Sequence, residues 1–249
     1  MKTIYSAGHT IAGMATGAAI LSLMAAQGAQ AAPVCDPGNG GITLPSGFCA
    51  LVAADNIGTA RQAVVAANGD LYVARQGTNG GVVALRDTNG DGKFDVKEQF
   101  GDGSGTGIAF HDGYLYVAQT DRLVRWKMTP GQLKPSGAME VVVGGMTAPS
   151  EHHDKGLAFG TDGAAYVNVG PPSNACQVKD RTKGSPGQDP CPILEMHGGI
   201  WKFSAARLNQ KQEDGSRIVT GLRQEPDVAW AHGAVYTVMN NRDQIDVLY

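Results

Sequence analysis

The sequence predicts an all-β protein with the architecture of a β-propeller. A hairpin motif recurs four times: an apolar stretch, a turn glycine and then a strand that contains Tyr. The chain also holds 35 glycines and only 17% charged residues, and no long segment after residue 31 has a helical period. A hairpin that returns every 44 to 70 residues is typical of a propeller with one four-stranded blade per repeat. The turn glycines are Gly69, Gly113, Gly163 and Gly233.

Further strands follow the repeated hairpins. An Asn-Gly pair between β-forming residues, as at Asn68 and Gly69, is a strong hairpin signal. A long insertion, 171–199, follows the third hairpin, and we expect one short helix at 204–212. About four blades are therefore present, and we interpret them as part of a longer ring because no closing strand is recognisable after the fourth hairpin. The predicted strands outside the motifs are 81–85, 122–126 and 200–203.

The first 31 residues predict a secretory signal peptide. Lys2 is its only charge, an apolar run spans 11–26, and residues 29–31 (Ala-Gln-Ala) suit cleavage. A membrane anchor is the alternative, but the apolar run is short and rich in Ala and Gly. We therefore expect a periplasmic or secreted protein with a propeller domain at 32–249 and no membrane span once the signal is removed.

The charge of the chain argues against some classes of partner, and its cysteine spacing argues against a metal site. The chain carries 20 basic and 23 acidic residues without a Lys/Arg run, which argues against nucleic acid and anionic lipid. Its four cysteines form two pairs close in sequence, Cys35 with Cys49 and Cys176 with Cys191. In an exported protein this spacing predicts two local disulfides, and no CxxC or Cys/His spacing indicates a metal site.

Residues 87–98 match the calcium-loop pattern throughout. Oxygen ligands stand at positions 1, 3 and 5, a glycine at 6, an apolar residue at 8, Asp at 9 and Glu at 12. The alternative is a metal-free Asp/Asn/Gly turn between strands. Because no amphipathic helices flank the loop, we expect calcium to stiffen an interblade connection rather than to form an EF-hand. The predicted ligands are the side chains of Asp87, Asn89 and Asp91, the carbonyl of Lys93, and Asp95 and Glu98.

Two strand entrances carry residues that suit catalysis or ligand binding. The stretch 151–156 (Glu-His-His-Asp-Lys-Gly) runs into the third repeat and supplies a histidine base that titrates near neutral pH. An exposed polar loop is the alternative, and zinc is disfavoured because adjacent histidines point apart on an extended chain. Arg223 stands before the fourth repeat, where it could face the same central mouth and bind an anionic or quinone ligand. The alternative is a surface arginine.

Together these segments resemble the soluble quinoprotein sugar dehydrogenases, the glucose/sorbosone dehydrogenase family of six-bladed propellers. The resemblance is carried by 151–152, 157–170, 198–203 and 220–223, and the cysteine-bearing insertion is similar to that of the sorbosone-dehydrogenase-like branch. It covers nearly all of the chain after the signal and includes the calcium loop. It stops where the family continues for roughly two more blades, which implies a ring that is incomplete at its C-terminus.

Members of this family bind pyrroloquinoline quinone (PQQ) on Ca²⁺ and oxidise aldoses or aldehydes. The resemblance implies that His152 is the general base and that Arg223 contacts the quinone, with Gln224 standing where the family usually has Asn. The implied function is a PQQ-dependent sugar or aldehyde dehydrogenase with a small-molecule substrate and an electron acceptor that the sequence does not identify. The alternatives are a non-catalytic exported propeller with structural calcium, an inactive fragment of the dehydrogenase, and a metal-dependent sugar-lactone hydrolase.

Overall fold

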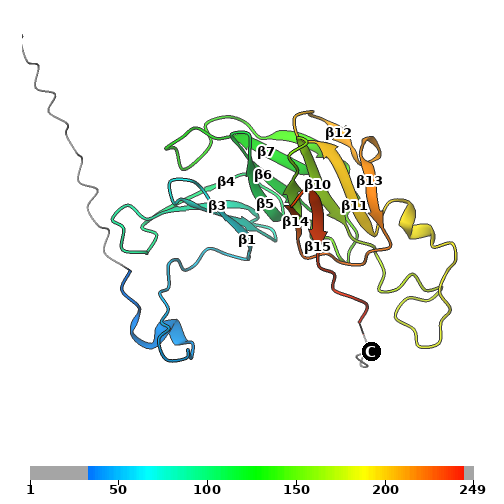
Figure 1. Ribbon diagram of the computed structural model, residues 1–249, viewed down its shortest axis with the longest axis horizontal. Coiled ribbons are helices and arrows are strands. Elements are labelled where there is room, and N and C mark those ends of the chain that lie inside the picture. The colour runs from blue at the N-terminus through cyan, green and yellow to red at the C-terminus, as the bar shows by residue number, and fades with distance from the viewer. Residues whose placement is uncertain (1–32, 244–249) are drawn as a thin grey trace, which may run out of the picture. The chain divides into compact units, whose positions relative to one another are not determined.

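The computed structural model describes residues 33–243, which fall within one compact unit, 32–249. The described residues form fifteen β-strands and three short 3-10 helices (Figure 1). The predicted signal peptide, 1–31, lies outside them. Within 33–243 no helix is long and apolar enough to cross a membrane. The 3-10 helices are η1 (Pro37–Gly41), η2 (Pro192–Glu195) and η3 (Gln212–Asp214).

Three sheets contain the four antiparallel strands expected of a propeller blade. Blade 1 is β1 (Ala60–Val65), β2 (Leu71–Arg75), β3 (Gly81–Arg86) and β4 (Val96–Phe100). Blade 2 is β5 (Gly105–His111), β6 (Tyr114–Gln119), β7 (Leu123–Lys127) and β8 (Glu140–Gly144). Blade 3 is β9 (Leu157–Phe159), β10 (Ala164–Val169), β11 (Gly199–Ser204) and β13 (Ser216–Thr220). A fourth sheet pairs β14 (Val228–Ala231) with β15 (Ala234–Thr237).

Each of the four predicted hairpins is present with its glycine in the turn. The hairpins join β1 to β2, β5 to β6, β9 to β10 and β14 to β15. The glycines have φ values between 73° and 90°. A residue with a Cβ atom adopts this left-handed region of φ only at a cost in free energy, so glycine is required for these turns. They are Gly69, Gly113, Gly163 and Gly233.

The hydrophobic core lies between neighbouring blades. Tyr72 of blade 1 packs with Phe110 and Trp126 of blade 2, while Tyr116 of blade 2 packs with Trp201 of blade 3. The middle strands of a blade are covered on both faces, so β3 and β10 are apolar almost throughout and nearly every residue in them is buried. Burial of one large apolar side chain stabilises the fold by roughly 1.5–3 kcal/mol. The packed blades therefore form a stable scaffold that carries the loops at their ends.

The predicted helix at 204–212 is wrong. Gln210 and Lys211 form β12, which adds a fifth strand to the sheet of blade 2 by pairing in parallel with β8. The buried Gln210 side chain donates hydrogen bonds to the carbonyls of Val142, at 3.3 Å, and Ser204, at 2.8 Å. Residues 210–211 form a strand and not a helix because the edge of β8 has backbone N–H and C=O groups that a neighbouring strand can hydrogen-bond and a helix cannot.

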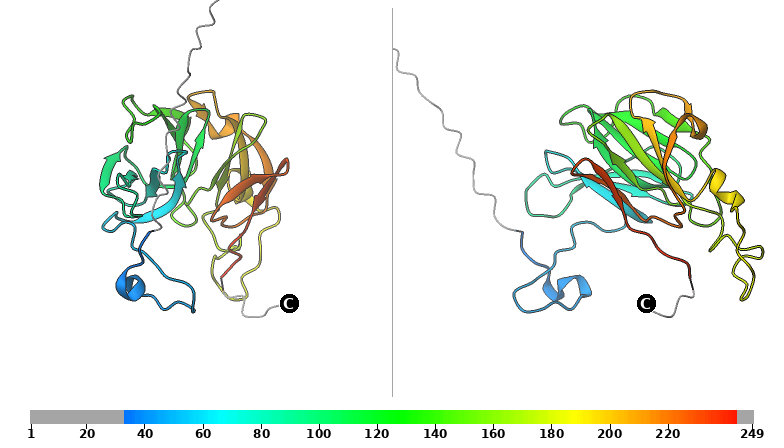
Figure 2. Two further views of the ribbon diagram at one scale, coloured as in Figure 1. Left: turned by 60° about the vertical axis from the view of Figure 1, so that its left-hand side comes forward. Right: turned by 45° about the vertical axis from the view of Figure 1, so that its right-hand side comes forward.

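Both predicted disulfides are present, Cys35–Cys49 and Cys176–Cys191, so all four cysteines are paired. The second disulfide closes the insertion between β10 and β11. Figure 2 shows this insertion (yellow) leaving blade 3 beside the segment that follows β15 (red). The two segments are hydrogen-bonded, because the Asp243 backbone N–H donates to Asn174 Oδ1 at 2.9 Å. Arg181 of the insertion and residues 240–243 after β15 line the same pocket.

Candidate functional site

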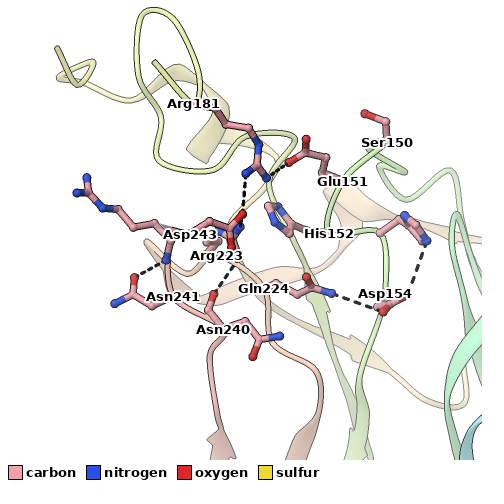
Figure 3. Close-up of a pocket in the computed structure, with 12 residues that line it drawn as sticks. Ser150, Glu151, His152, Asp154, Arg181, Arg223, Gln224, Asn240, Asn241 and Asp243 are labelled. Atoms are coloured by element: carbon pink, nitrogen blue, oxygen red, sulfur yellow. Dashed lines mark hydrogen bonds and ion pairs between the residues drawn. The ribbon is translucent and has the colours of Figure 1, made fainter. Parts of the chain in front are cut away.

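A pocket of about 870 Å³ lies where the chain enters β9 and β14 (Figure 3). Its lining comes from four segments: 150–154 before β9, Arg181 of the insertion, 223–224 before β14, and 240–243 after β15. His152 and Arg223 both line it, as the equivalent positions of the two repeats predict. The fold therefore brings together two residues that are 71 positions apart in the sequence.

His152 is held in one tautomer by a backbone group. Its side chain is buried, and Nδ1 lies 2.8 Å from the carbonyl oxygen of Pro171. A carbonyl oxygen only accepts hydrogen bonds, so Nδ1 of the neutral ring carries the proton and Nε2 keeps a lone pair. His152 can therefore act as a base toward the pocket through Nε2.

Gly170 makes this arrangement sterically possible. A Cβ atom at Gly170 would lie 2.7 Å from the Cβ of His152 and closer still to the His152 carbonyl oxygen. His152 itself has a φ of +52°, a left-handed conformation that is unusual for a residue with a side chain. Unusual backbone conformations of this kind persist where neighbouring structure imposes them, and they gather at functional sites.

Asn168, which the sequence analysis missed, fastens the stretch after His152 to β10. Its side chain is fully buried; Oδ1 accepts the Gly156 N–H, and Nδ2 donates to the Asp154 carbonyl at 3.2 Å. The available signal was a single amide inside an otherwise apolar strand (Ala-Ala-Tyr-Val-Asn-Val). A polar residue at such a position is usually satisfied by a specific partner.

Arg223 is about nine-tenths buried and only partly satisfied. Nη1 donates to the Asn240 carbonyl at 3.2 Å, and Nη2 lies 3.1 Å from Asp243 Oδ2. Its Nε–H is buried and has no hydrogen-bond partner among the described residues. A buried guanidinium with a free donor suits an anionic ligand in this pocket.

Arg181, also missed from the sequence, extends from the insertion to the pocket wall. Nη2 lies 2.7 Å from Glu151 Oε2 and Nη1 lies 2.6 Å from Asp243 Oδ2. The hydrogen bonds that Arg181 donates to the two carboxylates raise the pKa of Arg181 above its usual value, and the same contacts lower the pKa values of Glu151 and Asp243. The pocket therefore contains a charge network contributed by three separate segments.

Asp154 anchors the other side of the pocket. Its carboxylate lies 2.7 Å from Arg61 of blade 1 and accepts hydrogen bonds from Gln76 and from Thr106, the latter at 3.3 Å. His153 is more exposed than His152, and its Nε2 is 3.7 Å from Asp154. Of the two adjacent histidines, only His152 is buried and oriented by a close hydrogen bond.

Glu225, two residues after Arg223, is an unsatisfied buried carboxyl group. It has no exposed surface, and both carboxyl oxygens lack a hydrogen-bond partner among the described residues. Burial raises the pKa of Glu225 to about 7. Its sequence neighbourhood gave no signal, because burial depends on β14 packing against blade 3.

The predicted calcium loop has a defined conformation but a different location from the one expected. It joins β3 to β4 inside blade 1, so the prediction of an interblade connection is wrong. The Asp87 carboxylate accepts backbone N–H groups of Asn89, Gly90 and Gly92, at 2.6 to 3.1 Å. These bonds lower the pKa of Asp87 below its usual value.

Asp91 and Asp95, two further predicted calcium ligands, lie in the loop itself, whereas Glu98 lies in β4. The Asp91 carboxylate accepts the Lys93 N–H at 2.8 Å, and Asp95 accepts hydrogen bonds from Thr88. Glu98 lies in β4 and forms an ion pair with Lys134 at 3.1 Å. Within 33–243 no three or more His, Cys, Asp or Glu side chains are placed to hold a metal ion. The loop therefore offers oxygen donors, while Glu98 is engaged elsewhere.

Comparisons with known proteins agree with this architecture. A family model described as TrAA12-like matches residues 42–248. The chain is similar to the holo form of the pyranose dehydrogenase PQQ domain from Coprinopsis cinerea, with a TM-score of 0.61 and 16% identity over 77% of this chain and 46% of that one. It is also similar to a calcium structure of Carbohydrate-Active Enzymes Family AA12 from Trichoderma reesei, with a TM-score of 0.61 and 16% identity over 76% of this chain and 48% of that one. No curated protein matches the sequence.

These likenesses confirm the predicted fold class, an all-β propeller. At such low identity they carry the fold and no further property. The chain spans about half the length of the solved structures it matches.

Proposed function

This chain belongs to the TrAA12-like family, and from that premise we propose that it is a quinoprotein oxidoreductase domain that oxidises an aldose sugar or an aldehyde with PQQ as hydride acceptor. The observation that carries the proposal is that one pocket is lined both by His152, whose Nδ1 bonds the Pro171 carbonyl, and by Arg223, whose Nε–H has no hydrogen-bond partner among the described residues. Two similar structures, a pyranose dehydrogenase PQQ domain and a member of Carbohydrate-Active Enzymes Family AA12, support the same class of reaction.

The pocket fits the proposed cofactor chemically. PQQ carries carboxylates and a quinone, and Arg223 and Arg181 supply guanidinium groups on the pocket wall. The buried Nε–H of Arg223 has no acceptor among the described residues, so the hydrogen-bonding capacity of this guanidinium is only partly used, which supports an anionic ligand. When bound, the quinone supplies a centre that accepts two electrons as a hydride.

His152 is proposed to remove the hydroxyl proton of the substrate. Nε2 accepts that proton, and Nδ1–H remains on the Pro171 carbonyl, which stabilises the imidazolium that forms. Because the orienting group is a neutral carbonyl rather than a carboxylate, it aligns the ring without adding a negative charge. The anionic side chain of Asp154, which lines the same pocket, is fixed by Arg61.

Calcium is a second component of the proposal. We place it in the loop of blade 1, with the side chains of Asp87, Asn89 and Asp91, the carbonyl of Lys93 and the side chain of Asp95 as ligands. The hydrogen bonds from the loop N–H groups to Asp87 support this placement, since they shape the turn before a cation arrives. Glu98 would complete the ligand set by leaving Lys134.

We further propose that the protein is periplasmic or secreted and that its substrate is sorbosone-like. The two disulfides support export, because disulfides persist in oxidising compartments. The similarity of the insertion to that of the sorbosone-dehydrogenase-like branch supports the substrate class. The electron acceptor would be a separate partner, and the pocket residues do not indicate its chemical class.

The decisive experiment is titration of the purified chain with PQQ and Ca²⁺, followed by dye reduction with a panel of aldoses and aldehydes. We expect stoichiometric PQQ binding and substrate-dependent dye reduction that His152→Ala abolishes and His153→Ala, the matched control, retains. If this chain and a version extended by further blades both fail to bind PQQ, the proposal is overturned in favour of a non-catalytic propeller. Binding by the extended version alone would identify this chain as an inactive fragment.

A further inference from the structure

The carboxylate of Asp243 lies between two arginines of the pocket. Its Oδ2 is 2.6 Å from Arg181 Nη1 and 3.1 Å from Arg223 Nη2 (Figure 3). The two arginines come from the insertion and from the entrance of β14, so the carboxylate links segments that are distant in sequence. One oxygen shared by two guanidinium groups marks a position that is built for a carboxylate.

The arginines are held independently of Asp243. Arg223 is about nine-tenths buried and also donates to the Asn240 carbonyl at 3.2 Å. Arg181 is fixed on its other side by Glu151 at 2.7 Å. If the Asp243 carboxylate moved away, both guanidinium groups would keep a partner and their places in the pocket.

Asp243 is the more exposed member of its two ion pairs. Its side chain is 52% exposed, so its carboxylate regains hydration when it turns away, and a ligand carboxylate would replace it as the counter-ion of the buried Arg223. Its backbone is anchored separately, because its N–H donates to Asn174 Oδ1 at 2.9 Å and Asn174 is buried. The side chain can therefore leave the arginines by rotation alone, while the segment stays in place.

We propose that Arg181 and Arg223 form a carboxylate-binding pair and that Asp243 is an internal carboxylate that occupies this pair until a carboxylate-bearing ligand displaces it. Replacement of one carboxylate by another keeps the charge beside the two guanidinium groups unchanged. In taking PQQ as the natural ligand, the inference rests on the proposed function. The arginine pair itself does not depend on the identity of the ligand, because it follows from the contacts of Arg181 and Arg223 with Asp243.

The test compares ligand binding to the wild type, Asp243→Asn and Arg181→Gln, with PQQ and with pyridine-2,6-dicarboxylate as separate probes. Isothermal titration measures affinity, and circular dichroism confirms that each variant is folded. Asp243→Asn removes the competing charge and should tighten both probes by about tenfold, the effect of one charge-assisted hydrogen bond. Arg181→Gln should weaken both by about tenfold, and Arg181→Lys should restore part of the loss.

Arg242→Gln is the matched control. Arg242 lines the same pocket but forms no ion pair among the described residues, so its loss should change affinity by less than about threefold. Equal affinities in the wild type, Asp243→Asn and Arg181→Gln would overturn the inference, as would failure of both probes to bind any variant. Tighter dicarboxylate binding by Asp243→Asn without PQQ binding would support the pair and contradict the proposed function instead.

Discussion

His152 donates its Nδ1–H to the backbone carbonyl of Pro171 at 2.8 Å, so the orientation of the proposed base depends on a main-chain group of the insertion. No side-chain substitution removes that acceptor. The contact is nevertheless sensitive to the backbone before it, because Gly170 lies against His152.

Gly170→Ala should displace His152. The new Cβ would lie 2.7 Å from the His152 Cβ, so the 152–154 backbone must shift and Nδ1 should lose its carbonyl partner. We expect a stability loss of about 1–3 kcal/mol, typical of overpacking. Nitrogen-15 NMR of the imidazole should show a change in the tautomer of His152.

The control for this variant is Gly137→Ala, since a Cβ at Gly137 meets no atom within 4 Å and its φ is not positive. An unchanged His152 spectrum in Gly170→Ala would contradict the proposed constraint.

Glu225→Gln should stabilise the protein at pH 8 and have little effect near pH 4. The pKa of Glu225 is raised to about 7 in the folded state from an ordinary 4.5, so the folded state binds the proton more tightly than the unfolded state does. Stability therefore falls as pH rises from about 4.5 to about 7 and then levels off. The difference at pH 8 is roughly 3–3.5 kcal/mol, since the shift from 4.5 to about 7 is about 2.5 pKa units and each unit corresponds to about 1.4 kcal/mol.

Urea denaturation of the wild type and Glu225→Gln at several pH values measures this difference directly. A constant offset between the two proteins from pH 4 to pH 8 would show that Glu225 does not titrate in this range. Glu213→Gln is a suitable control, because Glu213 is exposed.

Calcium should raise the melting temperature. A ligand that binds only the folded state at 100 times its dissociation constant adds about 2.7 kcal/mol, which corresponds to about 5–10 °C for a domain of this size. Thermal unfolding in excess chelator and in excess Ca²⁺ measures the shift, and Asp87→Ala should abolish it. The same melting temperature in both conditions would contradict the site.

Lys134→Met tests the role of Glu98 in that site. The substitution frees Glu98 from its ion pair, so a Glu98 that completes the calcium site should then bind the ion more tightly. An unchanged calcium affinity would remove Glu98 from the ligand set and leave the loop residues alone.

Replacement of Cys176 and Cys191 by Ser should destabilise the insertion that carries Arg181. The disulfide closes a loop with a sequence separation of 15 residues, for which chain entropy gives about 3 kcal/mol. Proteolysis should cleave the variant preferentially within 177–190. Equal protease resistance in the wild type and the double variant would show that the hydrogen bonds of the insertion are sufficient.

Much of the fold could be read from local patterns. Gly69, Gly113, Gly163 and Gly233 were predictable because a tight hairpin turn requires a positive φ in a single residue, and neighbouring strands then follow from alternating apolar residues. The disulfides were predictable because both pairs are close in sequence. The helix expected at 204–212 failed where a distant strand edge, that of β8, competed with local propensity.

The site was only half predictable for the same reason. His152 and Arg223 occupy strand entrances, and a repeated architecture brings such entrances to one end of the molecule. Their partners gave weaker signals or none: Asn168 stands out only as a single amide in an apolar strand, Arg181 looks like one more loop residue, and Glu225 looks like an ordinary charged residue. Each acquires its role from a contact made across the chain.

The amino-acid sequence alone thus specified the hairpins, the cysteine pairs and the two principal pocket residues, because these depend on short-range geometry and on a repeat. Packing between blades decided the rest: the tautomer of His152, the burial of Glu225 and the sharing of Asp243 by Arg181 and Arg223. The physical reason is that hydrogen bonding, desolvation and charge pairing depend on distances in space. Segments far apart in the sequence set those distances only when the blades assemble.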